Sequence, residues 1–204
     1  QRTMNLLSIQ NLLTRNLGLT FSGNRIKQLT REEVEQLLPQ AELALAVKSN
    51  LAVLQCLTEQ IESIEEVVFA QLKLREGFAP LLTVSGIGQI LGMTIMLETG
   101  EIGRFATVGD FASYCRCVGS QKLSNGKRKG QGNTKNGNKY LAWAFVEAAN
   151  FAVRYNAQIK RFYQRKQVKT NGVVAIKAVA HKLARACYYI LRDQVAFDVN
   201  KAFA

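Results

Sequence analysis

The sequence predicts a mostly α-helical protein in which a long coiled-coil-like helix precedes a compact helical domain. Three observations lead to this fold class. Apolar residues recur at three- and four-residue spacings, the stretch 40–75 contains neither Gly nor Pro, and no clear alternation of apolar and polar residues marks a strand. Apolar residues make up 48 % of the 204-residue chain, which is ordinary for a protein with a buried core.

The N-terminal segment predicts short helices. An apolar stripe over residues 3–16 indicates a helix that ends near Gly18. Thr30 and Glu33 have the spacing of a capping box, so a second helix is expected to begin there. Pro39 either ends that helix or opens the next one.

The stretch 40–75 predicts one long helix with a heptad-like seam. Thr58 and Glu65 are the polar positions of that seam. A helix of this length outruns a small core, which favours a dimerisation or spacer helix, while packing on its own domain is the alternative. The apolar seam positions are Val47, Leu51, Leu54, Ile61, Val68 and Leu72.

Gly77 and Pro80 then interrupt the chain, and we place a domain boundary there. Residues 1–77 form a linker and long-helix region, with coiled-coil or dimerisation character. Residues 78–204 form the second, compact helical domain, with helices expected at 89–97, from Thr107 to Tyr114, from 139 into the 150s, and at 173–192. Thr107 and Asp110 have the spacing of a helix cap.

The net charge of the chain, and its uneven distribution, indicate which class of partner the protein binds. Lys and Arg number 27 against 15 Asp and Glu, a formal charge of +12. Residues 1–100 carry 8 basic and 10 acidic side chains, whereas residues 101–204 carry 19 and 5. An excess confined to one half indicates nucleic-acid binding, although charge alone leaves an anionic membrane surface open.

Two Gly-containing segments are candidate contacts for that partner. In Ser85-Gly86-Ile87-Gly88, Gly86 and Gly88 allow a tight turn whose backbone N–H groups can face a phosphate, as in a helix-hairpin-helix element; a tight turn without a ligand is the alternative. The segment 119–138 predicts a basic, Gly-rich polar loop. Its candidate nucleic-acid-binding residues are Lys122, Lys127, Arg128, Lys129, Lys135, Asn138 and the adjoining Lys139.

Ser124 is the candidate nucleophile in this loop. Three consecutive cations follow it closely, and such a field favours an attacking oxygen and stabilises a phosphorane-like transition state. Ser120 is the reserve candidate, and Tyr140 or Tyr163 is a weaker alternative of the tyrosine-recombinase kind. The aromatic residues of the second half otherwise fall at helical spacing, which favours a role in the core.

Several classes of protein do not fit the sequence. The single histidine, His181, stands among cations without a nearby acid, which argues against a catalytic triad. Cys115-x-Cys117 lacks zinc spacing, the acids form no two-metal cluster, and no phosphate-loop motif is present, so no metal site is expected in this chain. Four cysteines without a disulfide pattern, no membrane-spanning run and no signal peptide predict a cytoplasmic protein without a membrane partner.

The stretch 82–149 resembles the C-terminal transposase domain of insertion-sequence transposases related to the Piv DNA invertase, also called bridge-RNA-guided recombinases. The segment 1–75 is similar to the linker and coiled-coil region of the same family. The matching pieces are Val84–Gly88, Phe105 with Phe111–Tyr114, Ser124–Lys127, Thr134–Leu141 and Glu147–Ala149.

The resemblance implies a bacterial DNA transposase or recombinase. The family's serine nucleophile falls on Ser124, which would attack a DNA phosphodiester and form a phosphoserine–DNA intermediate before strand exchange. A structured guide RNA selects target and donor DNA, and the protein works as a homo-oligomer, here through the long helix. Four acids and Mg²⁺ belong to an N-terminal RuvC-like domain that this sequence lacks, so we expect no cofactor in this chain and no activity of the chain alone.

Three positions depart from the family pattern. Asn125 follows the serine where Gly is usual, Gly119 stands where proline is common, and Ala142 replaces an Arg. Two other interpretations therefore stay open. One is a non-catalytic helix-hairpin-helix module that binds DNA or RNA, and the other is a scaffold that oligomerises through residues 40–75.

Overall fold

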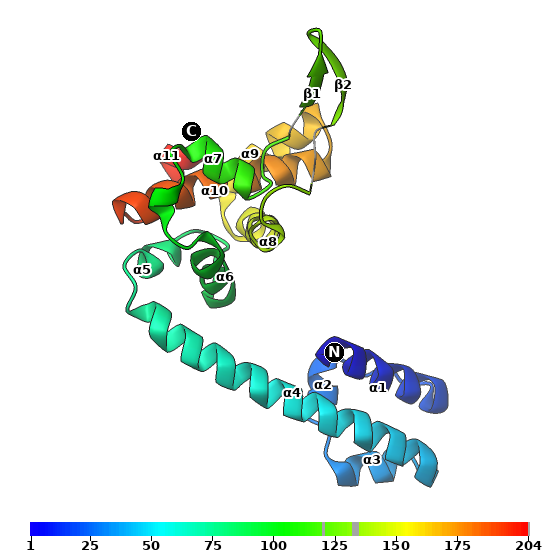
Figure 1. Ribbon diagram of the computed structural model, residues 1–204. Helices are drawn as coiled ribbons and strands as arrows, with labels where there is room; N and C mark the ends of the chain where they lie inside the picture. The colour runs from blue at the N-terminus through cyan, green and yellow to red at the C-terminus, as the bar shows by residue number, and fades with distance from the viewer. Residues whose placement is uncertain (120, 132–134, 204) are drawn as a thin grey trace. The chain divides into compact units, whose positions relative to one another are not determined.

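The computed structural model describes residues 1–119, 121–131 and 135–203. In these residues the chain is mostly helical, which confirms the predicted fold class, and it also contains one two-stranded hairpin (Figure 1). The chain divides into two compact units, Gln1–Val67 and Val68–Ala204, and each has its own hydrophobic core. Across the described ranges, no helix is long and apolar enough to cross a membrane.

The N-terminal unit is built from three short helices and most of a long one. The helices are α1 (Arg2–Leu17), α2 (Gly23–Lys27), α3 (Arg31–Leu37) and α4 (Ala41–Lys73). Their apolar faces share a core of ten buried residues: Ile9, Leu13, Ile26, Leu29, Val34, Leu38, Ala44, Val47, Leu51 and Leu54.

The predicted ends of these helices are confirmed. Gly18 follows α1 in the left-handed conformation, with φ 66°, where a residue without a side chain is least strained. Thr30 and Glu33 form the predicted capping box: the Thr30 hydroxyl accepts from the Glu33 N–H, and the Glu33 carboxylate accepts from the Thr30 N–H. Both local signals therefore act as the sequence indicates.

Helix α4 confirms the long helix, but its predicted seam serves the two cores of this chain. Val47, Leu51 and Leu54 are buried in the N-terminal core, whereas Leu72 is buried in the C-terminal core. The predicted domain boundary after residue 77 lies ten residues beyond the observed division after Val67. The reason is that the last turns of α4 pack on the second core, with the Phe69 and Phe78 rings 5.8 Å apart.

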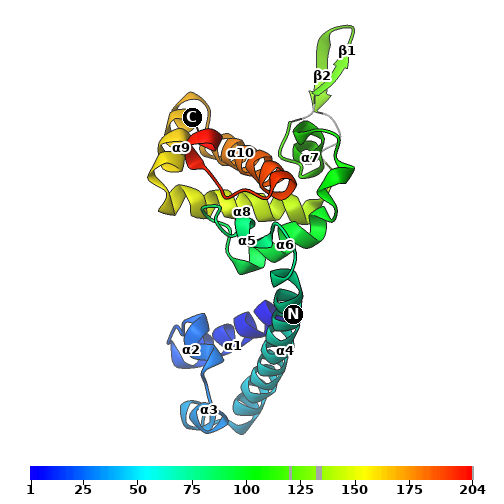
Figure 2. The same ribbon diagram turned by 90° about the vertical axis from the view of Figure 1, so that its left-hand side faces the viewer.

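In the described residues of the C-terminal unit, seven α-helices, one 3₁₀ turn and the hairpin follow one another along the chain. Helix α10 packs against α7, α8 and α9, and it supplies much of the buried core (Figure 2). The elements are α5 (Phe78–Leu81), α6 (Gln89–Thr99), η1 (Ile102–Arg104), α7 (Val108–Tyr114), β1 (Gln121–Ser124), β2 (Lys127–Gln131), α8 (Lys139–Tyr155), α9 (Ala157–Lys169), α10 (Gly172–Asp193) and α11 (Val199–Phe203).

Local signals again explain the helix starts. The Thr107 hydroxyl accepts from the Asp110 N–H, and the Asp110 carboxylate accepts from the Thr107 N–H, which confirms the predicted cap of α7. Helix α9 occupies the basic stretch that the sequence left without an assigned structure. It begins because the Asn156 side chain accepts from the N–H groups of Gln158 and Ile159.

The segment predicted as a polar loop contains an antiparallel hairpin, so the expectation of no strand is wrong here. Strands β1 and β2 are joined by Asn125 and Gly126, with φ values of 50° and 71°. Two successive positive φ values are those of a type I′ turn, which matches the twist of paired strands. Register shifts between Lys122 and Leu123, which marks a bulge, and the hairpin projects from the unit beside α7 (Figure 2).

Candidate nucleic-acid interface

Ser124 is the last residue of β1, at the tip of the projecting hairpin. It pairs with Lys127 across the two-residue turn, and both residues are exposed. Lys129 on β2 is exposed as well. Cations placed here would stabilise negative charge developing on a phosphate beside the serine oxygen. Neither strand contains an acid or a histidine, so a general base for this serine has to come from elsewhere.

Some predicted residues have no side-chain description. Lys122 and Arg128 lie in β1 and β2, but their side chains fall outside the described part of the chain. Ser120, the reserve nucleophile, lies outside the described residues altogether. Lys135 and Lys139 are exposed between β2 and the first turn of α8, and Lys139 lies 4.8 Å from the centre of the Tyr140 ring.

Arg116 fastens the two ends of the hairpin segment together. Its guanidinium Nε and Nη2 donate to the Gly137 carbonyl at 3.1 and 2.7 Å, and Nη2 also donates to the Lys135 carbonyl. Gly137 has φ 90°, and a Cβ there would overlap the carbonyl of Tyr114. No local sequence signal predicted this clamp, because its partners are 19 and 21 residues away from Arg116.

Asn138 anchors the start of α8, a structural role in addition to its prediction as a nucleic-acid contact, which stays a prediction. Its Oδ1 accepts from the N–H groups of Tyr140 and Leu141, and its Nδ2 donates to the Glu98 carboxylate at 2.6 Å. The side chain is half-buried and its amide is engaged within the fold. Hydrogen bonding from Arg104, and then from Asn138, lowers the pKa of Tyr114 beside this anchor.

Gly86 serves helix packing in this structure. It has φ 90°, and an added Cβ would overlap the Ala148 carbonyl and lie 2.7 Å from the Ala152 N atom. The neighbouring Ser85 hydroxyl accepts from the Asn156 side chain at 3.1 Å, which ties the same turn to the junction of α8 and α9. Gly86 thus lies against α8, whereas Gly88 precedes α6 with open space around it.

The sequence predicts that the aromatic residues of the second half lie in the core, but several of those on α8 are exposed. Tyr140, Trp143, Phe151 and Tyr155 are 51 %, 48 %, 42 % and 75 % exposed, and their spacing places them on one face. Phe145 and Tyr188 are buried as expected. The first of these exposed residues, Tyr140, lies in the first turn of α8. The helical spacing of the aromatic residues does not by itself show which face of α8 is covered by the rest of the unit.

The remaining tyrosine, histidine and cysteine candidates do not form a reactive site in the described residues. Tyr163 is half-buried, with its hydroxyl oriented toward Gly172. Burial, followed by the charges of Arg185 and Lys182, lowers the pKa of His181, so this imidazole is neutral at pH 7. Burial raises the pKa of the Cys117 thiol to about 12. Within the described ranges, no group of three or more His, Cys, Asp and Glu side chains could hold a metal ion.

The comparisons with known proteins match this unit. Residues 79–164 match the family described as Transposase IS116/IS110/IS902. This segment is similar to a transposase region of that family. The matched segment runs from α5 through most of α9 and includes the hairpin with Ser124.

A curated relative is also named as a transposase. The chain is 26 % identical over 146 residues to the transposase for insertion sequence element IS1328 of Yersinia enterocolitica. The alignment covers 70 % of this chain and 44 % of that transposase, so the chain spans less than half of the relative's length. The comparisons therefore support the coarse part of the resemblance, a transposase region.

Proposed function

We propose that the C-terminal unit carries the nucleophile of a DNA transposase or recombinase, and that Ser124 is that nucleophile. The observation that carries the proposal is the position of Ser124. It lies exposed at the tip of a cationic hairpin, inside the segment that matches the transposase family. A projecting hairpin with a two-residue turn can place a serine oxygen against a DNA backbone without moving the core.

The reaction would be phosphoryl transfer in two steps. The Ser124 oxygen attacks the phosphorus of a DNA phosphodiester, a serine–phosphate bond forms, and the bond to one deoxyribose oxygen breaks. That oxygen takes up a proton and leaves as a hydroxyl group. In the second step, a hydroxyl of another strand attacks the phosphoserine and releases the enzyme, so no net hydrolysis occurs.

The exposed lysines would support this transfer. Lys127 stands opposite Ser124, with Lys129 on the same strand, and both can balance charge on the pentacovalent phosphate. We propose that a RuvC-like domain with its acids and Mg²⁺ completes the site, and that a structured RNA chooses the DNA. Both partners follow from the family resemblance, and the cationic surface of this unit is compatible with them.

We also propose that the protein associates through α4. Val53, Ile64 and Val67 are 48 %, 63 % and 57 % exposed, and their spacing places them on one face of the helix. This face differs from the one that builds the N-terminal core. Sedimentation velocity is expected to show an oligomer that Ile64→Glu with Val67→Glu converts to a monomer, while Lys73→Glu does not.

The test of the nucleophile is a trapping assay. The chain is combined with a RuvC-like partner domain, a family-type guide RNA and a nicked suicide DNA duplex, and covalent protein–DNA adducts are separated by denaturing gel. We expect an adduct that Ser124→Ala abolishes and Ser120→Ala retains, with DNA binding unchanged because Ser124 is exposed. Salt-sensitive binding without any adduct would contradict the proposal and favour a non-catalytic nucleic-acid-binding module.

A further inference from the structure

Helix α9 carries a density of positive charge that folding does not require. Five of its thirteen residues are basic and none is acidic. Arg161, Arg165 and Lys169 follow at four-residue intervals, and like charges at this spacing destabilise a helix by about 0.2–0.5 kcal/mol per pair. The described part of the chain shows no ion pair to any of these basic residues. An external anion would relieve this repulsion.

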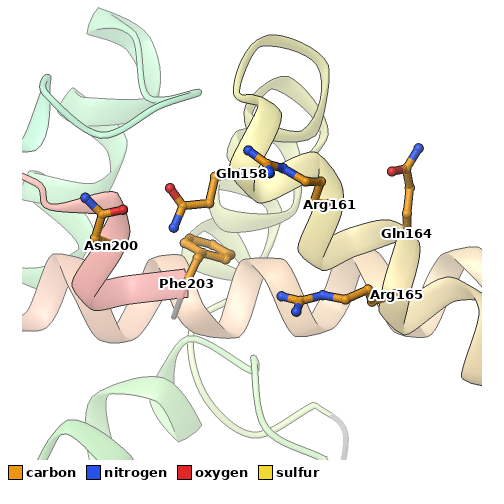
Figure 3. A pocket seen from close by; sticks show the side chains of 6 residues that line it. All are labelled: Gln158, Arg161, Gln164, Arg165, Asn200 and Phe203. Carbon is orange, nitrogen blue, oxygen red and sulfur yellow. The ribbon is translucent and has the colours of Figure 1, made fainter.

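A pocket lies on the same face of α9, next to α11. It has a volume of about 630 Å³ and opens to solvent. Figure 3 shows the Arg161 and Arg165 side chains extending toward the side of the pocket where α11 carries Asn200 and Phe203. Gln158 and Gln164 complete the lining, so guanidinium and amide groups stand beside the Phe203 ring.

The far wall of the pocket is held firmly in place. Lys182 on α10 donates from Nζ to the Ala202 carbonyl at 2.8 Å, and its ammonium lies 5.2 and 5.6 Å from the ring centres of Phe162 and Phe203. These two rings meet edge to face, with their centres 5.4 Å apart. Helix α11 is thereby fixed against α9, and the pocket does not need a ligand to form.

The nearest acid in sequence does not neutralise the pocket. Asp198 uses Oδ1 to accept from the N–H groups of Asn200 and Lys201, at 2.8 and 3.3 Å, and so caps α11. Arg161 donates from Nε to the Ala157 carbonyl at 3.4 Å within its own helix, a contact that leaves its terminal nitrogens for another acceptor. The two guanidinium groups therefore remain available to an anion.

We propose that the pocket between α9 and α11 binds the phosphodiester backbone of a nucleic acid, as a contact separate from the Ser124 hairpin. Arg161 and Arg165 are one helical turn apart, about 6 Å along the axis, and guanidinium groups bind phosphate through paired hydrogen bonds. Gln158 and Asn200 supply amide N–H donors beside them. The contact reads no bases, so it positions the strand without choosing the sequence.

The test compares two double variants of the full chain that lose the same charge. Arg161→Ala with Arg165→Ala removes the pocket cations, whereas Lys177→Ala with Arg185→Ala removes two exposed cations of α10 that do not line the pocket. Fluorescence anisotropy measures binding of a short labelled DNA duplex and, separately, a structured RNA hairpin across a range of NaCl concentrations. Thermal unfolding confirms that each variant is folded.

For Arg161→Ala with Arg165→Ala we expect a loss of affinity of about tenfold or more. For duplex DNA, the magnitude of the slope of log K against log salt concentration should fall by about 1.8. The α10 variant should lose much less. The arm with the larger loss, DNA or RNA, identifies which backbone the pocket holds. Equal losses in the two double variants, or an unchanged slope in the pocket variant with both probes, would overturn the proposal.

This inference does not rest on Ser124. Ser124→Ala is expected to leave both the affinity and the salt slope unchanged, because a phosphate contact on α9 needs no nucleophile. Loss of binding in the pocket variant, together with no adduct in the wild-type chain, would refute only the serine chemistry. An adduct lost in Ser124→Ala, with unaltered binding by the pocket variant, would refute only the pocket.

Discussion

The two units of the chain differ in their charge balance and in how many of their cations form ion pairs. Residues 1–67 carry 6 basic and 8 acidic side chains, whereas residues 68–204 carry 21 and 7. In the N-terminal unit, two cations form ion pairs with acids at the surface: Arg25 contacts Glu33 and Lys48 contacts Glu35, each at 2.6 Å. In the described part of the C-terminal unit, the ion pair found joins the adjacent residues Arg192 and Asp193.

This difference is what the proposed nucleic-acid contacts of the C-terminal unit require, since their anionic partner has to meet cations that are not already paired. The N-terminal unit has nearly as many bases as acids, so its charges need no counterpart from outside. In the described part of the C-terminal unit, Lys127 and Lys129 on the hairpin and the five basic residues of α9 are exposed, and no ion pair joins them to an acid. The segment that matches the transposase family lies in this second unit.

The largest expected effect tests the packing of the C-terminal unit. Gly86→Ala should lower the free energy of unfolding of this unit by about 2–6 kcal/mol, since left-handed strain and overlap with α8 each contribute about 1–3 kcal/mol. Trp143, the single tryptophan, reports on this unit by fluorescence in urea. Gly103→Ala is the control, because open space surrounds Gly103. Equal shifts in the two variants would contradict the packing role.

The next effect tests whether the units unfold separately. Leu51→Ala removes a buried side chain of the N-terminal core and should lower that unit's stability by about 2–5 kcal/mol. Circular dichroism should detect the loss, while the Trp143 transition stays in place. Leu45→Ala, on the same helix but 63 % exposed in the native fold, is the matched control. A Trp143 midpoint that moves as far as the circular dichroism midpoint would show one cooperative unit.

The smallest effect compares the same capping device in both units. Thr30→Ala and Thr107→Ala each remove a capping hydroxyl, and each should destabilise its own unit by about 0.5–2 kcal/mol. The measurement is the denaturant midpoint followed by both signals. Thr30→Ser and Thr107→Ser keep the hydroxyl and should retain most of the stability. Serine variants as unstable as the alanine variants would show that the cap is not the cause.

Local signals predicted much of the fold, because caps and breaks act within a few residues. Thr30 with Glu33 and Thr107 with Asp110 do what their spacing indicates. The hairpin was missed although Asn125-Gly126 is a strong turn signal, because the flanking strands are polar and lack apolar alternation. Contacts between residues far apart in the sequence have no comparable local signal, so they could not be predicted.

The site was predicted at the level of its segment rather than of each side chain. Ser124 and Lys127 do lie together and exposed on one hairpin. Asn138 and Gly86, which the sequence predicts as ligand contacts, also contact Glu98 and the α8 backbone, and these contacts could not be predicted because they join residues distant in sequence. The α9 pocket was equally hidden, since Asn200 and Phe203 reach it from a helix far along the chain.

The most direct test of the serine assignment is peptide mapping of the trapped DNA adduct by mass spectrometry. Trypsin cuts after Lys122 and Lys127, so the peptide 123–127 contains Ser124 as its single hydroxyl group, whereas Ser120 and Tyr140 fall in other peptides. We predict a nucleotide-derived phosphate on peptide 123–127. The same mass addition on peptide 117–122, or on the peptide that contains Tyr140, would contradict the account and move the nucleophile away from the hairpin tip.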